Sequence, residues 1–152
     1  MSVFHSYSRE QLRRSYADAW AKRTAHALLT PLEALITDVI ASHPEFHALV
    51  ADTRAAADFD APAASAAENP FLHMGLHLAV REQVSVDRPP GIRDLRRQLL
   101  ASHDDAHQAE HALMDALGET LWNAQRTGRA PDETQYLNLL RERLAKARRS
   151  NR

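Results

Sequence analysis

Apolar residues recur at intervals of three and four along most of this chain, which is the spacing that places them on one face of an α-helix. The helices predicted in this way cover residues 8–26, 31–43, 69–85, 91–126 and 132–144, with a short helical piece at 43–50. Glycine numbers only 4 and aromatic residues make up 6% of the chain, so the composition also favours helices over a turn-rich β fold. The sequence therefore predicts an all-α protein, a helical bundle of about five to six helices.

Capping residues mark several helix boundaries. Thr30, Pro31 and Glu33 stand in the order of a cap, a first-turn proline and a capping-box acid. Asn69 followed by Pro70 is a second start signal of the same kind. We therefore expect helices to begin at both places.

The length of 152 residues suits one domain with a core and is too short for two of ordinary size. We expect a single helical domain over residues 1–152, built around a four-helix core. Residues 52–68 are rich in alanine and aspartate without an apolar period, and they predict a long loop. The basic tail at 141–152, "RERLAKARRSNR", is expected to be a solvated helix end, because arginines suit the negative end of a helix dipole.

Charge and hydropathy narrow the classes of partner. The formal net charge of -1 lacks the positive excess that attracts nucleic acid or anionic lipid. No apolar run approaches the roughly 20 residues that span a bilayer, and "MSVFHSYSREQ" lacks the charged start and apolar stretch of a secretory signal. We expect a cytoplasmic protein with neither nucleic acid nor membrane as a partner.

Histidines are paired more often than chance predicts. The chain has 9 of them, and random placement would give roughly half of one pair at spacing four. The pairs found at this spacing are His43 with His47, His73 with His77, His103 with His107, and His107 with His111. Spacing four puts both rings on one helix face, close enough to chelate one ion.

These pairs predict a metalloprotein that binds one or two transition-metal ions through His-x3-His pairs on two helices. The ligands we expect are His73, His77, His107 and His111, supplemented by Glu110 or His47. Because the chain has no cysteine, nitrogen and oxygen must hold the metal, so Fe or Zn is expected first, with Mn, Ni or Cu as alternatives. Asp115 is expected either to ligate below His111 or to face solvent.

A second hypothesis needs no metal. Buried imidazoles can instead hydrogen-bond carbonyl or carboxylate groups in a satisfied core. The chain would then be a helical interaction module that binds a protein partner or a second copy of itself. The sequence does not decide whether a metal site would be catalytic; "HQAEH" matches the H-x-x-E-H pattern of inverted zinc peptidases, but only 41 residues follow His111 to supply the rest.

The shared site also makes a geometric prediction. If residues 91–126 formed one helix antiparallel to residues 69–85, His77 and His111 would sit roughly 16 Å apart along the axis. A shared ion therefore requires a break, and Ser102 with Asp105 three residues later is the cap signal that would provide it. We expect a separate short helix at 92–101.

Four stretches carry a family resemblance: "LTPLEA", "HPEFH", "NPFLHMGLHLAVREQVSVDRPPGIR" and "EHALMDALGE". In these the chain resembles the small proteobacterial proteins grouped as domain of unknown function 1841, over about residues 4 to 143. The resemblance implies no established activity. The paired histidines on successive helices are also similar, at the level of pattern, to hemerythrin-like and DinB-like helical metalloproteins.

Overall fold

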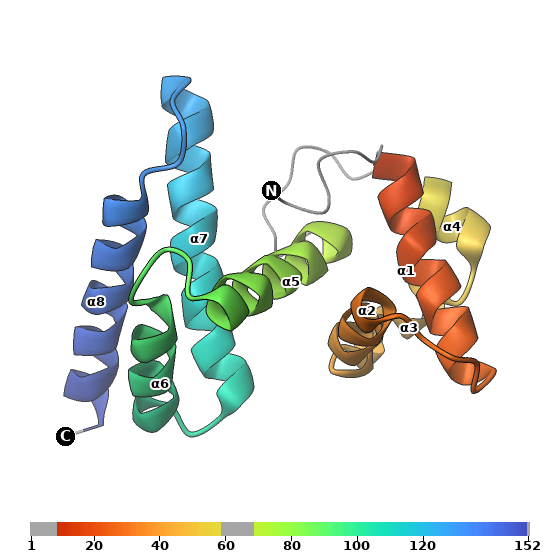
Figure 1. Ribbon diagram of the computed structural model, residues 1–152, viewed down its shortest axis with the longest axis horizontal. Coiled ribbons are helices and arrows are strands. Elements are labelled where there is room, and N and C mark those ends of the chain that lie inside the picture. Colours follow the sequence, from red (N-terminus) through yellow and green to blue (C-terminus); the bar gives the residue numbers. More distant parts are fainter. Residues whose placement is uncertain (1–8, 59–68, 152) are drawn as a thin grey trace. The chain divides into compact units, whose positions relative to one another are not determined.

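The computed structural model describes residues 9–58 and 69–151, and in these ranges it contains helices and no strand (Figure 1). Eight α-helices and one 3-10 turn are present in the described part. The all-α prediction is confirmed, whereas the expected count of five to six helices was too low. Short helices that lack a long apolar period account for the difference.

The helices fall into two units, Met1–Met74 and Gly75–Arg152. The division lies within helix α5, Pro70–Val86, so this helix contributes its first turn to one unit and the rest to the other. A single domain with one four-helix core stays a prediction.

In the first unit, helix α1 (Arg9–Thr24) packs against α2 (Pro31–Ala41) and α4 (Thr53–Asp58). The contact between α1 and α4 corrects the prediction of a loop throughout residues 52–68. Asp52 caps α4, since its Oδ1 accepts hydrogen bonds from the backbone N–H groups of Arg54 and Ala55, at 3.0 and 3.1 Å. Ala56 is completely buried. Its small side chain allows two helices to approach closely even though α4 has no apolar stripe. Residues 59–68 of the predicted loop lie outside the described residues.

The start of α2 has the predicted capping box. Oγ1 of Thr30 accepts from the N–H of Glu33 at 3.1 Å, and the N–H of Thr30 donates to Oε1 of Glu33 at 3.0 Å. Lys22 of α1 donates to the other carboxylate oxygen at 2.7 Å. The hydrogen bond from Lys22 and the one from the Thr30 backbone lower the pKa of Glu33 to about 2. The cap therefore also links two helices.

The short helical piece predicted after α2 is present as a 3-10 turn, Pro44–Phe46, followed by α3, His47–Val50. The core of this unit is made of aromatic and branched side chains with small residues between them. Its buried apolar members are Tyr16, Ala17, Ala19, Ile36, Val39, Ile40, Val50, Ala56, Phe71 and Met74.

In the second unit, α6 (Ile92–Ser102), α7 (Ala106–Thr127) and α8 (Glu133–Ser150) lie side by side and alternate in direction (Figure 1). Helix α5 joins them through its C-terminal part, where Oη of Tyr136 on α8 donates to Oε1 of Gln83 at 2.7 Å. The buried apolar residues of α6 to α8 are Ile92, Leu95, Leu99, Ala109, Leu113, Met114, Ala116, Leu117, Ala124, Tyr136, Leu140 and Leu144.

The predicted break between residues 92 and 126 is confirmed, because α6 ends at Ser102 and α7 begins at Ala106. The capping residue was predicted wrongly. Ser102 is the last residue of α6, where its hydroxyl donates to the Gln98 carbonyl at 2.9 Å. Asp105 caps α7 instead, accepting from the N–H of His107 at 2.7 Å. A carboxylate with extended backbone suits this position, since it also favours the positive end of the helix dipole.

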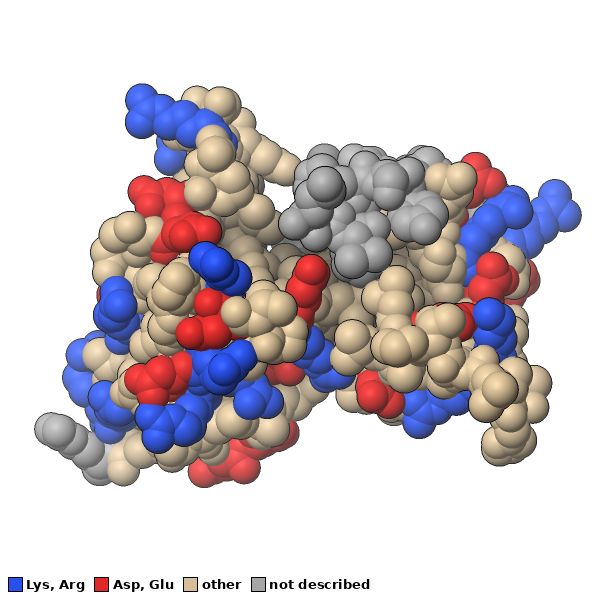
Figure 2. Space-filling model, in the orientation of Figure 1, with Lys and Arg blue, Asp and Glu red and all other residues tan. Residues whose placement is uncertain are grey.

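Charges of both signs are interspersed over α6 and α8 on the face shown in Figure 2. The basic tail continues α8, as expected, and Arg148 donates to Gln98 of α6 at 2.8 Å.

None of the helices in the described ranges has the length and apolarity needed to cross a bilayer.

Candidate metal centre

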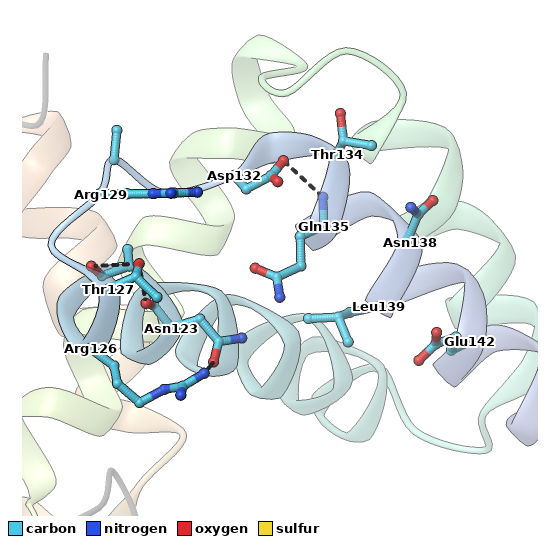
Figure 3. Close-up of a pocket in the computed structure, with 12 residues that line it drawn as sticks. Asn123, Arg126, Thr127, Arg129, Asp132, Thr134, Gln135, Asn138, Leu139 and Glu142 are labelled. Carbon is cyan, nitrogen blue, oxygen red and sulfur yellow. Dashed lines mark hydrogen bonds between the residues drawn. The ribbon is translucent and has the colours of Figure 1, made fainter.

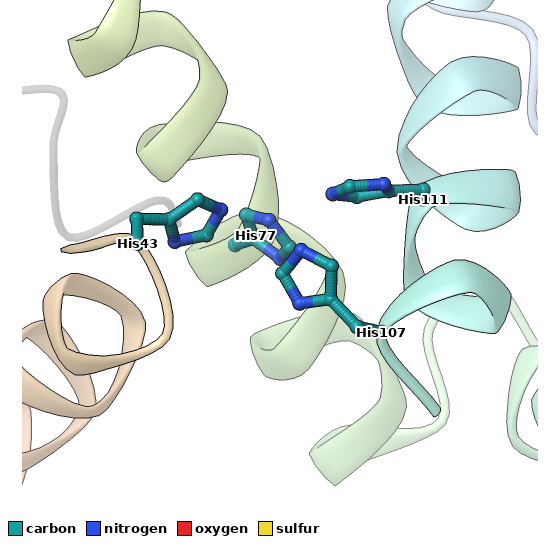
Figure 4. Close-up of side chains that lie close together, drawn as sticks. All are labelled: His43, His77, His107 and His111. Carbon is teal, nitrogen blue, oxygen red and sulfur yellow. The ribbon is translucent and has the colours of Figure 1, made fainter. Parts of the chain in front are cut away.

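Three of the predicted ligands converge within the second unit. His77 on α5, His107 and His111 on α7 each offer a ring nitrogen, and these nitrogens lie within 4.8 Å of one another. The ring centroids are 5.1 Å apart for His77 and His107, 5.2 Å for His77 and His111, and 4.2 Å for His107 and His111. Figure 4 shows the two rings of α7 pointing toward His77.

Helical geometry explains the pair on α7. His107 is in the first turn after the Asp105 cap, and His111 follows one turn later on the same face. Ala109 and Leu113, which alternate with the histidines, are buried and fix the rotation of the helix. The cap and the apolar contacts therefore direct both imidazoles to one side.

Glu110 on α7 also contacts the cluster, and its partner is Nδ1 of His77. Its Oε1 pairs with Nδ1 of His77 and also accepts from Nε of Arg81 at 3.0 Å. The side chain of His77 is completely buried and that of Glu110 is only 13% exposed. Because Nδ1 of His77 pairs with the carboxylate, an ion at the cluster would have to meet this ring through Nε2.

The ionisation of Glu110 follows from its neighbours. Burial alone raises the pKa of this carboxyl, but the hydrogen bond with His77 and the positive charge of Arg81 outweigh burial and hold the pKa below its ordinary value. A carboxylate behind an imidazole fixes its tautomer and orientation and makes it a better metal ligand. Glu110 is thus placed to orient His77 rather than to bind an ion directly.

The nitrogen positions suit one ion after a small contraction. Three nitrogens about 2.1 Å from a tetrahedral ion lie about 3.4 Å from one another. The 4.8 Å limit exceeds this spacing by an amount that side-chain rotation can remove. Three imidazoles would leave one tetrahedral position open for water or another ligand.

Two other predicted ligands belong to the first unit. Nε2 of His73 lies 3.1 Å from Nε2 of His43, so one of these nitrogens donates to the other. Nδ1 of His43 lies 2.7 Å from the Val39 carbonyl, and Nε2 of His47 lies 2.8 Å from the Ile40 carbonyl. The spacing of four had paired His43 with His47 and His73 with His77, whereas in this unit His73 contacts His43, and His43 and His47 each contact a backbone carbonyl.

The remaining acidic and histidine residues considered in the sequence lie away from the cluster or outside the described residues. Asp115 is exposed, which agrees with the solvent-facing alternative. His103 caps the end of α6, with Nδ1 2.8 Å from the Leu99 carbonyl. His26 is exposed, as expected, whereas His5 lies outside the described residues.

Arg81 was not among the site residues predicted from the sequence. It lies four residues after His77, on the same face of α5, and this spacing was the available signal. Its role depends on Glu110, which comes from another helix 29 residues later. Periodicity within one helix could not have revealed that pair.

The second unit has two surface hollows, and they differ in how close they lie to the histidine cluster. The larger, about 590 Å³, lies between the end of α7 and the start of α8 (Figure 3). Most of the residues that line it are polar and none is a histidine; among them, Arg126 donates to Asn123 one turn earlier on the same helix. The smaller, about 250 Å³, is lined by Glu110 and therefore adjoins the cluster.

Comparison with known proteins identifies the chain without supplying an activity. No match was found among curated proteins or among solved structures. The likeness to hemerythrin-like and DinB-like proteins is accordingly not shown. The model of one family, a domain of unknown function designated DUF1841, matches residues 8–142, which is most of the chain. The resemblance noted in the sequence is therefore confirmed, and the protein belongs to the DUF1841 family.

Proposed function

We propose that the second unit binds one transition-metal ion through His77, His107 and His111, with Glu110 and Arg81 orienting the first of these. The observation that carries the proposal is the convergence of three imidazoles from two helices, backed by a buried carboxylate on the far side of one ring. Metal-bound histidines regularly have such a carboxylate on the nitrogen that faces away from the ion.

The ligand set favours particular metals. Imidazole suits Zn, Fe, Ni and Cu, while Mn prefers carboxylate and water oxygens. Since Glu110 faces His77, the proposed inner ligands are all imidazoles, and we expect Zn or Fe. An open fourth position is the arrangement of catalytic rather than structural zinc sites. The proposed function is thus a metal centre able to bind and polarise a small ligand.

Elemental analysis of untagged protein tests the proposal. We expect at least about half an equivalent of Zn or Fe per chain, or stoichiometric uptake when apoprotein is titrated. His111→Ala should abolish uptake. His26→Asn is the matched control, because it removes an exposed imidazole and asparagine tolerates the left-handed backbone at that position (φ 56°).

The competing hypothesis is a metal-free module that binds a protein partner or a second copy of the chain. It predicts that neither metal nor chelator changes the melting temperature and that His111→Ala alters stability alone. Protein that contains no metal and takes up none of Zn, Fe, Mn, Ni or Cu would favour this module and refute the metal proposal. A cytoplasmic location stays a prediction from the sequence.

A further inference from the structure

A cleft of about 250 Å³ adjoins the histidine cluster within the second unit. Val80, Arg81, Val84 and Ser85 of α5 form one wall, and Arg96 of α6 and Glu110 of α7 form the others. Glu110 is shared, since the carboxylate that pairs with His77 also lines the cleft. A molecule in the cleft would therefore lie beside the carboxylate that orients His77.

The charges around the cleft do not cancel. Arg81 and Glu110 form an ion pair at 3.0 Å, which neutralises both. Arg96 is half-buried, and within residues 9–58 and 69–151 it makes no hydrogen bond or ion pair. The neighbouring arginines of α6 differ: Arg93 donates to the carbonyls of Val84 and Ser85, and Arg97 pairs with Asp94. One guanidinium in the cleft thus lacks a counter-charge.

The walls define the ligand that would supply this charge. Val80 is buried and Val84 half-buried, so two branched side chains face the same space as the guanidinium. The volume is below the roughly 300–1,000 Å³ of pockets for drug-sized ligands. One uncompensated positive charge, that of Arg96, matches one negative charge on the ligand. A planar carboxylate also matches the two-pronged guanidinium donor.

From this arrangement we infer that the cleft binds the carboxylate group of a small aliphatic acid, held by Arg96 with its chain against Val80 and Val84. Any role for that acid at a metal centre rests on the proposed function, because the cleft meets the cluster through Glu110, the carboxylate that orients His77.

Butyrate is a suitable probe, with butyramide as its uncharged counterpart. Methyl signals of Val80 and Val84 would be followed by NMR during titration of the full-length protein, once as apoprotein and once with one equivalent of Zn²⁺. We expect saturable shifts with butyrate and at least about tenfold weaker binding of butyramide, the loss expected when a charged hydrogen bond is removed.

Arg96→Gln should weaken butyrate binding about tenfold, and Arg96→Lys should give an intermediate loss because it keeps the charge without the fork. Arg97→Gln is the matched control on the same helix, since Arg97 is exposed and outside the cleft, and it should bind butyrate like the wild type. Arg81 is left intact because it also holds Glu110.

The outcomes separate the two proposals. Zinc uptake without saturable butyrate shifts, or equal binding of butyrate and butyramide, would overturn the carboxylate site and leave the metal centre standing. Butyrate binding that depends on Arg96 in a protein that takes up no metal would support the carboxylate site and overturn the metal centre. Equal losses in Arg96→Gln and Arg97→Gln would indicate nonspecific charge attraction and overturn the inference.

Discussion

Oε1 of Glu110 on α7 pairs with Nδ1 of His77 on α5, and the imidazole that makes this contact is completely buried. Arg81 holds the same carboxylate oxygen at 3.0 Å. Two helices separated by a turn and a further short helix are thereby joined at the candidate site. The negative charge of Glu110 in this pair should therefore affect how well His77 binds a metal.

Replacing Glu110 with glutamine should weaken zinc binding without abolishing it. The amide cannot act as the anionic partner of His77, and loss of such partners costs about 10–100-fold in metal affinity. Competition with a chromogenic zinc chelator would measure the change. Asp115→Asn is the matched control on the same helix, because Asp115 is exposed, and it should leave the affinity unchanged. If Asp115→Asn weakened zinc binding more than Glu110→Gln did, Asp115 and not Glu110 would be the carboxylate that supports the site.

Metal should raise the melting temperature. An ion that binds only the folded state at about 100 times its dissociation constant contributes about 2.7 kcal/mol, which corresponds to a shift on the order of 5–10 °C for a domain of this size. Calorimetry with and without one equivalent of Zn²⁺, followed by addition of a chelator, would measure this shift and its reversal. A melt that responds to neither addition would argue for structural histidines.

Removal of the α7 cap should affect metal binding as well as stability. Asp105→Ala leaves the N–H of His107 without its 2.7 Å acceptor and should cost about 1 kcal/mol of helix stability. Because His107 lies in the capped turn, zinc affinity should fall too, and Asp105→Ser should restore both.

Asp132→Ala provides the control for that experiment. It removes the equivalent cap of α8, where the carboxylate accepts from the N–H of Gln135 at 3.1 Å, away from the histidines. It should lower the unfolding free energy by a similar amount while zinc affinity stays at the wild-type value. Equal effects of both variants on affinity would show that general stability, not the position of His107, controls binding.

The pair between Glu33 and Lys22 should make stability depend on pH. Hydrogen bonds from Lys22 and the Thr30 backbone lower the pKa of Glu33 from 4.5 to about 2. Since the pKa is lower in the folded chain, the pair stabilises fully above about pH 5, and this contribution is lost as the pH falls toward 2.

Urea unfolding of the wild type and Glu33→Gln between pH 2 and 6 would reveal this dependence. The difference in unfolding free energy should be largest above pH 5 and vanish near pH 2. Lys22→Gln should reduce the pH dependence of the wild type in the same range. A constant difference between wild type and Glu33→Gln would mean that the carboxylate charge contributes nothing there.

Local chemistry made several features predictable from the sequence. The capping box at Thr30 and Glu33 and the break between α6 and α7 both depend on residues within a few positions of one another. Capping acts over three or four residues, so sequence neighbours are sufficient to specify it. The four-residue spacing of His107 and His111 placed both on one face for the same reason.

Contacts between helices decided the rest. Residues 53–58 form a helix that packs against α1 and buries Ala56 completely, although no local apolar period predicted it. His73 and His77 have the same spacing as the pair on α7, yet His73 contacts His43 while His77 meets Glu110 and the rings of α7. Glu110 orients His77 because Arg81 and His77 approach it from another helix. Spacing along one helix fixes only which face a side chain occupies, and its partner depends on which helix the chain brings to that face.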